Sequence, residues 1–79
     1  MEELLLADGF DAALIGTGER CGQPIVAVYD REKCIDILMT RDGMSVDEAA
    51  EYFEYNVQGA YVGEETPVFM NYKENILND

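Results

Sequence analysis

The alternation of hydrophobic and polar positions along the chain predicts strands first, then helices, then a strand. Residues 24–30, PIVAVYD, form an apolar, β-branched run between a proline and an aspartate, which is typical of a buried strand. Residues 11–16, DAALIG, are ambiguous between a strand and a short helical turn. As a strand, they would pair with 24–29 in a hairpin connected by residues 16–24, GTGERCGQP, in which Gly22 serves a bulged turn.

The next segment predicts a helix over residues 31–41. Asp30 is placed as its N-cap, and Gly43 stands just beyond it as a C-terminal stop. Its apolar residues cover more than half of the helix circumference, so we expect this helix to be mostly enclosed. These residues are Cys34, Ile35, Ile37, Leu38 and Met39.

The segment 44–59 carries the clearest local signal in the chain, again for a helix. Ser45 and Glu48 have the spacing of a capping box, in which each side chain satisfies a backbone donor at the helix start. Gly59 is placed to end the helix. The apolar stripe expected in the core comprises Val46, Ala49, Ala50, Phe53 and Val57. The acidic face edged by tyrosines comprises Asp47, Glu48, Glu51, Tyr52, Glu54 and Tyr55.

The order β-β-α-α-β predicts one α+β domain over residues 1–79, with a small antiparallel sheet and both helices on one face. Residues 60–70 predict the last strand, either bent or in two short pieces, and residues 71–79 predict a frayed polar tail. Because residues 25–29 are apolar in succession, both faces of their strand need cover. Two helices cover one face only. The N-terminal segment, the tail or a second copy must cover the other, and the small core favours a homodimer.

The composition argues against several classes of function. The chain has 79 residues, a net charge of −12 and no histidine. This charge repels nucleic acids and anionic membranes, so we expect no direct binding to either. No apolar run approaches the roughly 20 residues of a membrane span, and the acidic N-terminus is unlike a signal peptide. Two isolated cysteines are more typical of a reducing compartment, so we expect a cytoplasmic protein.

The acidic charge is concentrated in the second half of the chain. Residues 42–79 hold nine of the seventeen acids and one of the five bases, so attraction to a basic partner should begin there. An acidic helix face is most often simply solvated. Two features favour a binding function for it: tyrosines add contact area at little entropic cost, and the acidity exceeds the roughly 2–8 charges that keep a small domain soluble.

Catalysis and metal binding have little support in the sequence. Without histidine, a serine or cysteine nucleophile lacks its usual imidazole partner, and Ser45 is used by the capping box. Carboxylate pairs occur by chance at this density of acids. Asp42, Asp47 and Glu48 are too sparse for a calcium loop, and no cysteine–histidine pattern indicates zinc. We therefore predict a non-enzymatic protein without metal or cofactor.

The glycine-rich connection is an alternative site. Its backbone amides and Arg20 would form a nest for a phosphate or another anion, with a reactive thiol beside it and with Tyr29 or Tyr61 helping to enclose a small nucleotide. The residues of this site are Gly16, Gly18, Arg20, Cys21 and Gly22. The simpler interpretation is a hairpin loop whose glycines serve turn geometry. Because the glycine spacing matches neither the P-loop nor the dinucleotide fingerprint, we favour the simple loop.

Several short segments spread over nearly the whole chain resemble a group of small tailed-phage proteins. They are GF, RCGQP, AVYD, KCI, RDGM, EYFEYNV and GAYVGE. The group has no assigned activity, so no functional residue transfers. The resemblance implies a viral origin, and short acidic phage proteins often inhibit or sequester a host component, including defence factors. We therefore predict a non-catalytic binder of a basic host protein, such as a nucleic-acid-binding protein, with a small-nucleotide or anion sponge as the alternative.

Overall fold

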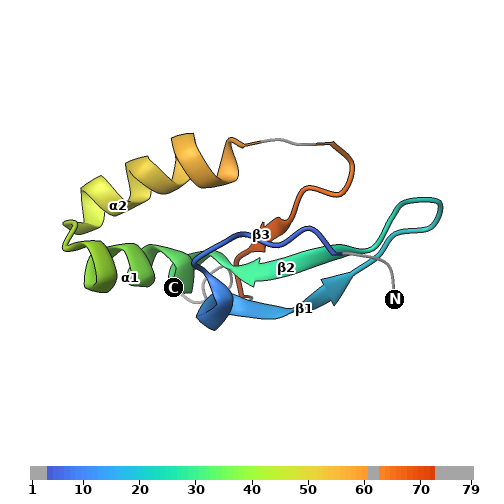
Figure 1. Ribbon diagram of the computed structural model, residues 1–79, viewed down its shortest axis with the longest axis horizontal. Helices are drawn as coiled ribbons and strands as arrows, with labels where there is room; N and C mark the ends of the chain where they lie inside the picture. The colour runs from blue at the N-terminus through green and yellow to red at the C-terminus, as the bar shows by residue number, and fades with distance from the viewer. Residues whose placement is uncertain (1–3, 61–62, 73–79) are drawn as a thin grey trace.

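The computed structural model describes residues 4–60 and 63–72 (Figure 1). The elements in chain order are the 3-10 turn η1 (Asp11–Ala13), β1 (Leu14–Gly18), β2 (Val26–Asp30), α1 (Arg31–Asp42), α2 (Val46–Tyr52), the π-helical segment η2 (Phe53–Gln58) and β3 (Val68–Met70). The predicted α+β class and the β-β-α-α-β order are confirmed. The ambiguous segment 11–16 is both a helical turn and the start of a strand. Residues 73–79, most of the predicted tail, lie outside the described residues.

The sheet is mixed rather than antiparallel throughout. β1 pairs antiparallel with β2, so that Leu14 lies opposite Tyr29 and Gly18 opposite Val26. β2 pairs parallel with β3, with Val28 opposite Val68. The helices separate β2 from β3 in sequence, and a connection of this length is what parallel neighbours require. The prediction of an antiparallel sheet was wrong on this point, because a strand pattern does not encode strand direction.

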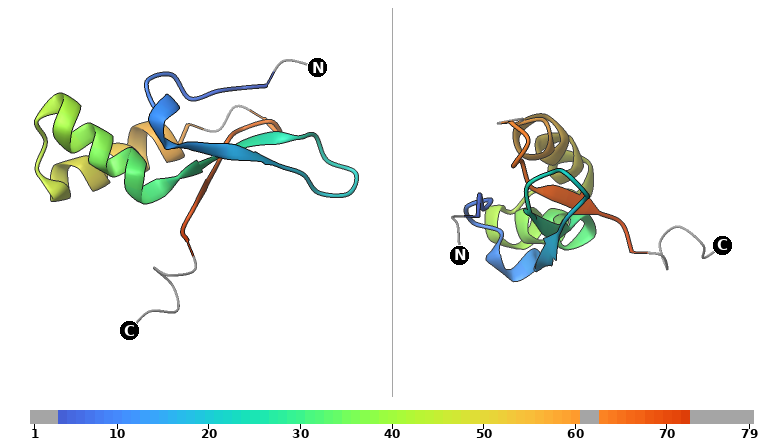
Figure 2. Two further views of the ribbon diagram at one scale, coloured as in Figure 1. Left: turned by 90° about the horizontal axis from the view of Figure 1, so that it is seen from below. Right: turned by 90° about the vertical axis from the view of Figure 1, so that its right-hand side faces the viewer.

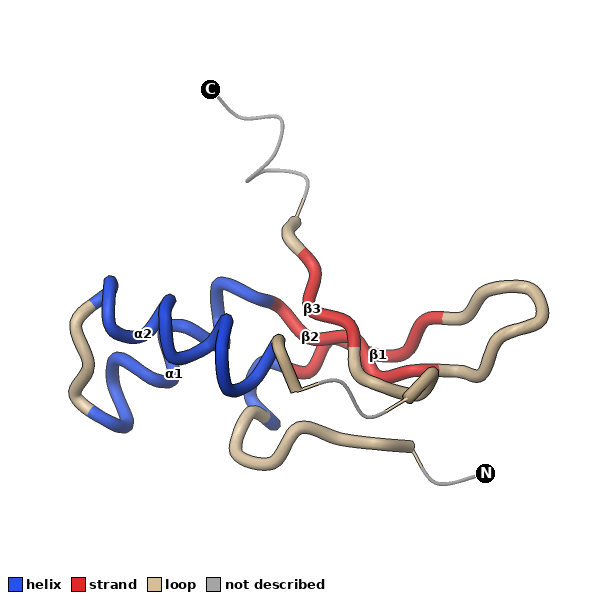
Figure 3. Tube along the Cα trace, turned by 90° about the horizontal axis from the view of Figure 1, so that it is seen from above, coloured by secondary structure: helices blue, strands red, loops and turns tan. Residues whose placement is uncertain are grey.

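The two helices lie side by side beyond one end of the sheet (Figures 1 and 3). α1 begins where β2 ends, α2 folds back along α1, and η2 returns toward β3. The molecule is therefore elongated, with extents of 38 × 29 × 20 Å. Helical side chains meet the sheet mainly at this junction rather than across a whole sheet face.

The predicted helix boundaries are confirmed in atomic detail. The Asp30 carboxylate accepts hydrogen bonds from two backbone N–H groups in the first turn of α1. Gly43 ends α1 with a φ of 70°, a left-handed conformation that favours glycine. The capping box is complete, since the Ser45 hydroxyl accepts from the Glu48 N–H (3.2 Å) and the Glu48 carboxylate accepts from the Ser45 N–H (3.0 Å).

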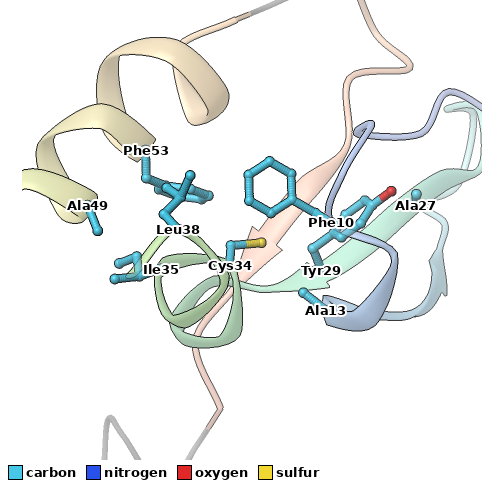
Figure 4. Packing of buried hydrophobic residues seen from close by; sticks show 9 residues of the cluster. All are labelled: Phe10, Ala13, Ala27, Tyr29, Cys34, Ile35, Leu38, Ala49 and Phe53. Atoms are coloured by element: carbon cyan, nitrogen blue, oxygen red, sulfur yellow. The ribbon is translucent and has the colours of Figure 1, made fainter. Parts of the chain in front are cut away.

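The core lies at the junction of helices and sheet (Figure 4). Its buried residues are Phe10, Ala13, Ala27, Tyr29, Cys34, Ile35, Leu38, Ala49 and Phe53. The Phe53 ring packs edge-on against Phe69 of β3 at 5.0 Å between centroids, and Phe69 lies 5.5 Å from Tyr29. This aromatic row (Phe53, Phe69 and Tyr29) joins η2 to the sheet. Val46, predicted in the core, is 57% exposed because the first turn of α2 lies at the far tip of the molecule.

Residues 4–10 form a strap along one face of the sheet (Figure 2). The backbone N–H of Ala7 donates a hydrogen bond of 2.8 Å to the hydroxyl of Tyr29. Arg41 holds the end of the strap, since its Nη1 donates to the carbonyl oxygen of Gly9 at 2.9 Å. The strap therefore supplies the cover that the sequence required for one of the two faces of β2.

Candidate protein-binding site

The acidic, tyrosine-edged face predicted on the second helix is exposed, because all six of its residues are exposed to solvent. Four of the six lie around one shallow hollow of ≈ 510 Å³, which we call the acidic hollow. It is lined by Met44, Glu48, Glu51, Tyr52, Tyr55 and Asn56. Tyr55 is 75% exposed and Tyr52 is 42% exposed. Tyrosines are enriched at protein interfaces, where the ring adds contact area and the hydroxyl can remain hydrated.

The structure does not bring the other two predicted residues, Asp47 and Glu54, into the acidic hollow. Glu54 lies against α1, where its Oε2 is 3.2 Å from Nη2 of Arg31. The Arg31 guanidinium also lies 5.5 Å from the centroid of the Phe53 ring. The helical wheel assumed a regular α-helix, whereas the chain changes to π-helical geometry at Phe53, so positions beyond it are rotated relative to the α-helical prediction.

The π-helical segment itself is a feature that the sequence did not predict. Segments of this kind are rare and are found frequently at functional sites. Gly59 permits it to end as it does, because a Cβ atom at this position would lie 2.8 Å from the carbonyl oxygen of Glu54. From the sequence, Gly59 was predicted only as a helix stop. Its close approach to the backbone shows that glycine is needed there for space.

A second hollow, the apolar cleft, lies between the strap, η2 and the residues that lead into β3. Its volume is ≈ 410 Å³. It is lined by Leu5, Leu6, Ala7, Asp8, Phe10, Arg41, Tyr52, Asn56, Val57, Ala60, Thr66, Pro67 and Phe69. No sequence pattern predicts this cleft, because its walls come from segments far apart in the chain. The available signal was the leucine run at 4–6, which no predicted element explained.

The electrostatics of both hollows are set by acids. Among the described residues, Arg41 is the one base in either lining, and its Nε and Nη2 each lie 3.1 Å from a carboxylate oxygen of Asp42. The hydrogen bonds to Asp42 raise the pKa of Arg41, and Arg41 in turn lowers the pKa of Asp42. The charge of Arg41 is therefore compensated, while Asp8, Glu48 and Glu51 leave the region negative.

The glycine-rich connection is an exposed hairpin loop at the opposite end of the molecule from the helix turn (Figure 1). The Gln23 N–H donates to the Arg20 carbonyl at 2.8 Å, and Gly22 has a φ of 82°, so this glycine serves turn geometry. The bulge of the hairpin lies elsewhere, between Leu14 and Gly16 of β1. The loop therefore has the local geometry that the simpler interpretation requires.

The surroundings of Arg20 do not favour an anion. A hollow of ≈ 360 Å³ beside the loop is lined by Arg20 but also by Glu19 and Glu64, so acids outnumber bases there. The hydroxyl of Tyr29 accepts a hydrogen bond from the strap and does not reach the loop. Tyr61 lies outside the described residues.

Both cysteines are free thiols. Cys21 is exposed in the hairpin loop, whereas Cys34 is buried in the core. Burial, reinforced by the negative charge of Asp30, raises the pKa of Cys34 to about 11. In the described ranges 4–60 and 63–72, no group of three or more cysteine, aspartate or glutamate side chains is arranged to hold a metal ion. None of the helices in the described part of the chain is long and apolar enough to cross a membrane.

Comparison with known proteins gives no relative from which a function can be transferred. The chain matches no protein-family model, no curated protein and no solved structure. The function is therefore inferred from the two hollows themselves.

Proposed function

We propose that the protein is a non-catalytic binding protein that holds a basic, amphipathic segment of a partner protein across the apolar cleft and the acidic hollow. The observation that carries this proposal is that Tyr52 and Asn56 line both hollows. The apolar cleft and the acidic hollow therefore form one continuous surface. Together they match a segment in which a large apolar side chain lies next to lysine or arginine.

Each hollow contributes a different part of the interaction. The apolar cleft offers Leu5, Leu6 and Val57 to a buried anchor residue. The acidic hollow places Glu48 and Glu51 where they attract the neighbouring cations, which speeds association and selects the charge of the partner. Because Asp42 compensates Arg41, no unpaired base among the described residues of the cleft lining repels such a segment.

The partner in this proposal is a protein with a basic surface. A chain of phage origin, as the sequence resemblance suggests, would meet such surfaces on the nucleic-acid-binding proteins of its host, including defence factors. Occupying that surface would block the nucleic acid and so inhibit or sequester the host protein. The net charge of −12 makes the chain itself resemble a nucleic acid in sign.

Selection from a random displayed-peptide library tests the proposal directly. We expect enriched peptides to combine lysine or arginine with a large apolar residue. The affinity of one such peptide is then measured for two charge-reversed variants. Glu51→Lys should weaken binding roughly tenfold, whereas Asp36→Lys makes the same change of charge on the exposed side of α1 and should have little effect.

Ionic strength and the most exposed tyrosine provide two further readouts. Raising the salt concentration from about 0.1 M to about 1 M shortens the Debye length from about 10 Å to about 3 Å and should weaken the peptide complex. Tyr55→Ala should also weaken it without unfolding the protein, because this side chain is largely exposed. Equal losses from Glu51→Lys and Asp36→Lys, or enrichment of peptides without basic residues, would contradict the proposal.

A further inference from the structure

The sheet face opposite the strap is apolar and open among the described residues. Tyr29 and Ala27 point toward the strap, so the alternate residues of β2 point to the other face. The pairing register places glycines of β1 and residues of β3 beside them. This valine–glycine face comprises Gly16, Gly18, Val26, Val28, Val68 and Met70.

The two glycines give this face a distinctive shape. A Cβ atom at Gly16 would meet nothing within 4 Å, whereas one at Gly18 would lie 3.1 Å from Cγ2 of Val28. The trough without side chains therefore lies above Gly16, and Val28 leans over Gly18 at its end. Val68 borders the same face and is 46% exposed. Projecting valines beside an empty trough are self-complementary, since a twofold axis brings the valines of one copy over the trough of another.

The charge distribution favours a second copy as the occupant. A chain with a net charge of −12 repels its own kind over most of its surface. The valine–glycine face carries one charge at its end, since the same alternation places Asp30 beside Met70, where its carboxylate caps α1. The hollow that this face shares with the hairpin contains Arg20 together with Glu19 and Glu64. This surface therefore carries less charge than most of the chain, and on it Arg20 of one copy can meet Glu19 or Glu64 of the other.

We propose that two copies of the chain associate through their valine–glycine faces about a twofold axis, as two packed sheets. The strap lies on the other side of the sheet (Figure 2). Strap residues line the apolar cleft, and residues between Met44 and Asn56 line the acidic hollow, so both stay accessible in the dimer. The dimer therefore presents two binding sites, which increases avidity for a partner with repeated basic segments. The association does not depend on the proposed partner, since it uses none of the residues that line the apolar cleft or the acidic hollow.

Two arginine substitutions at neighbouring positions of β1 test the proposal. Gly16→Arg fills the trough, whereas Thr17→Arg adds the same charge at an exposed position that pairs with Ala27, on the strap side. Gly16→Arg should leave the monomer folded, because the space above Gly16 is open. In sedimentation equilibrium we expect the wild type and Thr17→Arg to dimerise and Gly16→Arg to dimerise roughly a hundredfold more weakly. High salt should strengthen the dimer, because it screens repulsion between copies.

A second measurement needs no variant. In a mixture of isotope-labelled and unlabelled wild-type chains, intermolecular NOEs should connect the methyl groups of Val26, Val28 and Val68. The proposal is overturned if the wild type stays monomeric up to millimolar concentration, or if Gly16→Arg folds and dimerises as well as Thr17→Arg. Methyl NOEs arising only within one chain would overturn it equally.

Discussion

The acidic hollow and the valine–glycine face carry opposite chemistry within one small chain. Carboxylates and exposed tyrosines line the first, whereas valines and glycines form the second. Salt is expected to weaken association at the first and to strengthen it at the second, because it screens attraction in one case and self-repulsion in the other. The difference teaches that a strongly acidic chain can keep a charge-steered surface and a shape-matched surface apart, so that each can be tested without disturbing the other.

The largest expected effect comes from the residue that connects the two regions. Phe53 is fully buried and contacts Phe69, so Phe53→Ala leaves a cavity at the junction of η2 and the sheet. We expect a loss of about 3–5 kcal/mol in the free energy of unfolding, measured by urea titration. Both peptide binding and dimerisation should fail together, since a domain of this size has little stability to spare.

Tyr55→Ala is the control for that substitution, because it removes an exposed ring from the same segment. It should change the free energy of unfolding by no more than about 0.5 kcal/mol. If Phe53→Ala abolished peptide binding but left the dimer and its stability intact, the two regions would fold independently and the connecting role of the aromatic row would be wrong.

The second-largest expected effect is a loss of folding stability at high pH. It arises from Cys34 in the core that both regions share. The pKa of Cys34 is raised from 9.0 to about 11 in the folded chain. Between these values the unfolded chain releases the thiol proton more readily. The stabilising contribution is therefore complete below pH 9 and is lost as pH rises to about 11, at no more than about 1.4 kcal/mol per pH unit.

Urea titrations of the wild type and Cys34→Ala across this pH range isolate the contribution of the thiol. The variant loses packing at every pH but lacks the thiol, so its stability should fall less steeply above pH 9. Parallel curves for the two proteins would show that the thiol does not remain protonated in the folded state. The wild type should lose peptide binding and dimerisation over the same pH interval.

A pair of glycine substitutions compares the space available for a side chain in the two regions. Gly59→Ala forces a methyl group against the Glu54 carbonyl and should cost about 1–3 kcal/mol of stability, with weaker peptide binding because Tyr55 must move. Gly16→Ala meets open space and should be neutral or stabilising by about 0.4–1 kcal/mol in the monomer. Thermal melts at low protein concentration compare them. Equal costs would mean that the π-helical end does not depend on glycine.

The smallest expected effect comes from a substitution that should loosen the strap but leave the valine–glycine face unchanged. Tyr29→Phe removes the acceptor of the Ala7 N–H and should cost about 0.5–1.5 kcal/mol. Faster hydrogen exchange at Ala7 and weaker binding of apolar anchors are expected, because Leu5 and Leu6 line the apolar cleft. Dimerisation should be unchanged, since Tyr29 points away from the valine–glycine face. A change in dimerisation would show that the two faces of the sheet are coupled.

Local structure was largely predictable from the sequence, whereas the arrangement of the elements was only partly so. Asp30, Gly43, Ser45 and Glu48 specify helix ends through contacts with near neighbours, and all four act as expected. The direction of β3 and the exposure of Val46 depend on how distant elements pack, which no local pattern records. The π-helical turn was missed because a helical wheel assumes a constant number of residues per turn.

The candidate sites show the same limit. The acidic helix face could be identified from the sequence, because all of its residues lie in one helical segment. Four of them share one hollow. The apolar cleft could not be found in this way, since the strap, η2 and the residues before β3 meet only in the fold. The need for cover on both faces of β2 was visible in residues 25–29. The role of Gly16 and Gly18 in shaping one face required the strand register.

The unequal environments of the two thiols provide a practical handle. Cys34 is enclosed by the core, whereas Cys21 is exposed at the hairpin end, opposite the turn between α1 and α2. A maleimide reagent should therefore modify Cys21 alone in the native chain. A bead or dye attached there would leave the helices facing the solution, so the unaltered sequence can be tethered in one defined orientation.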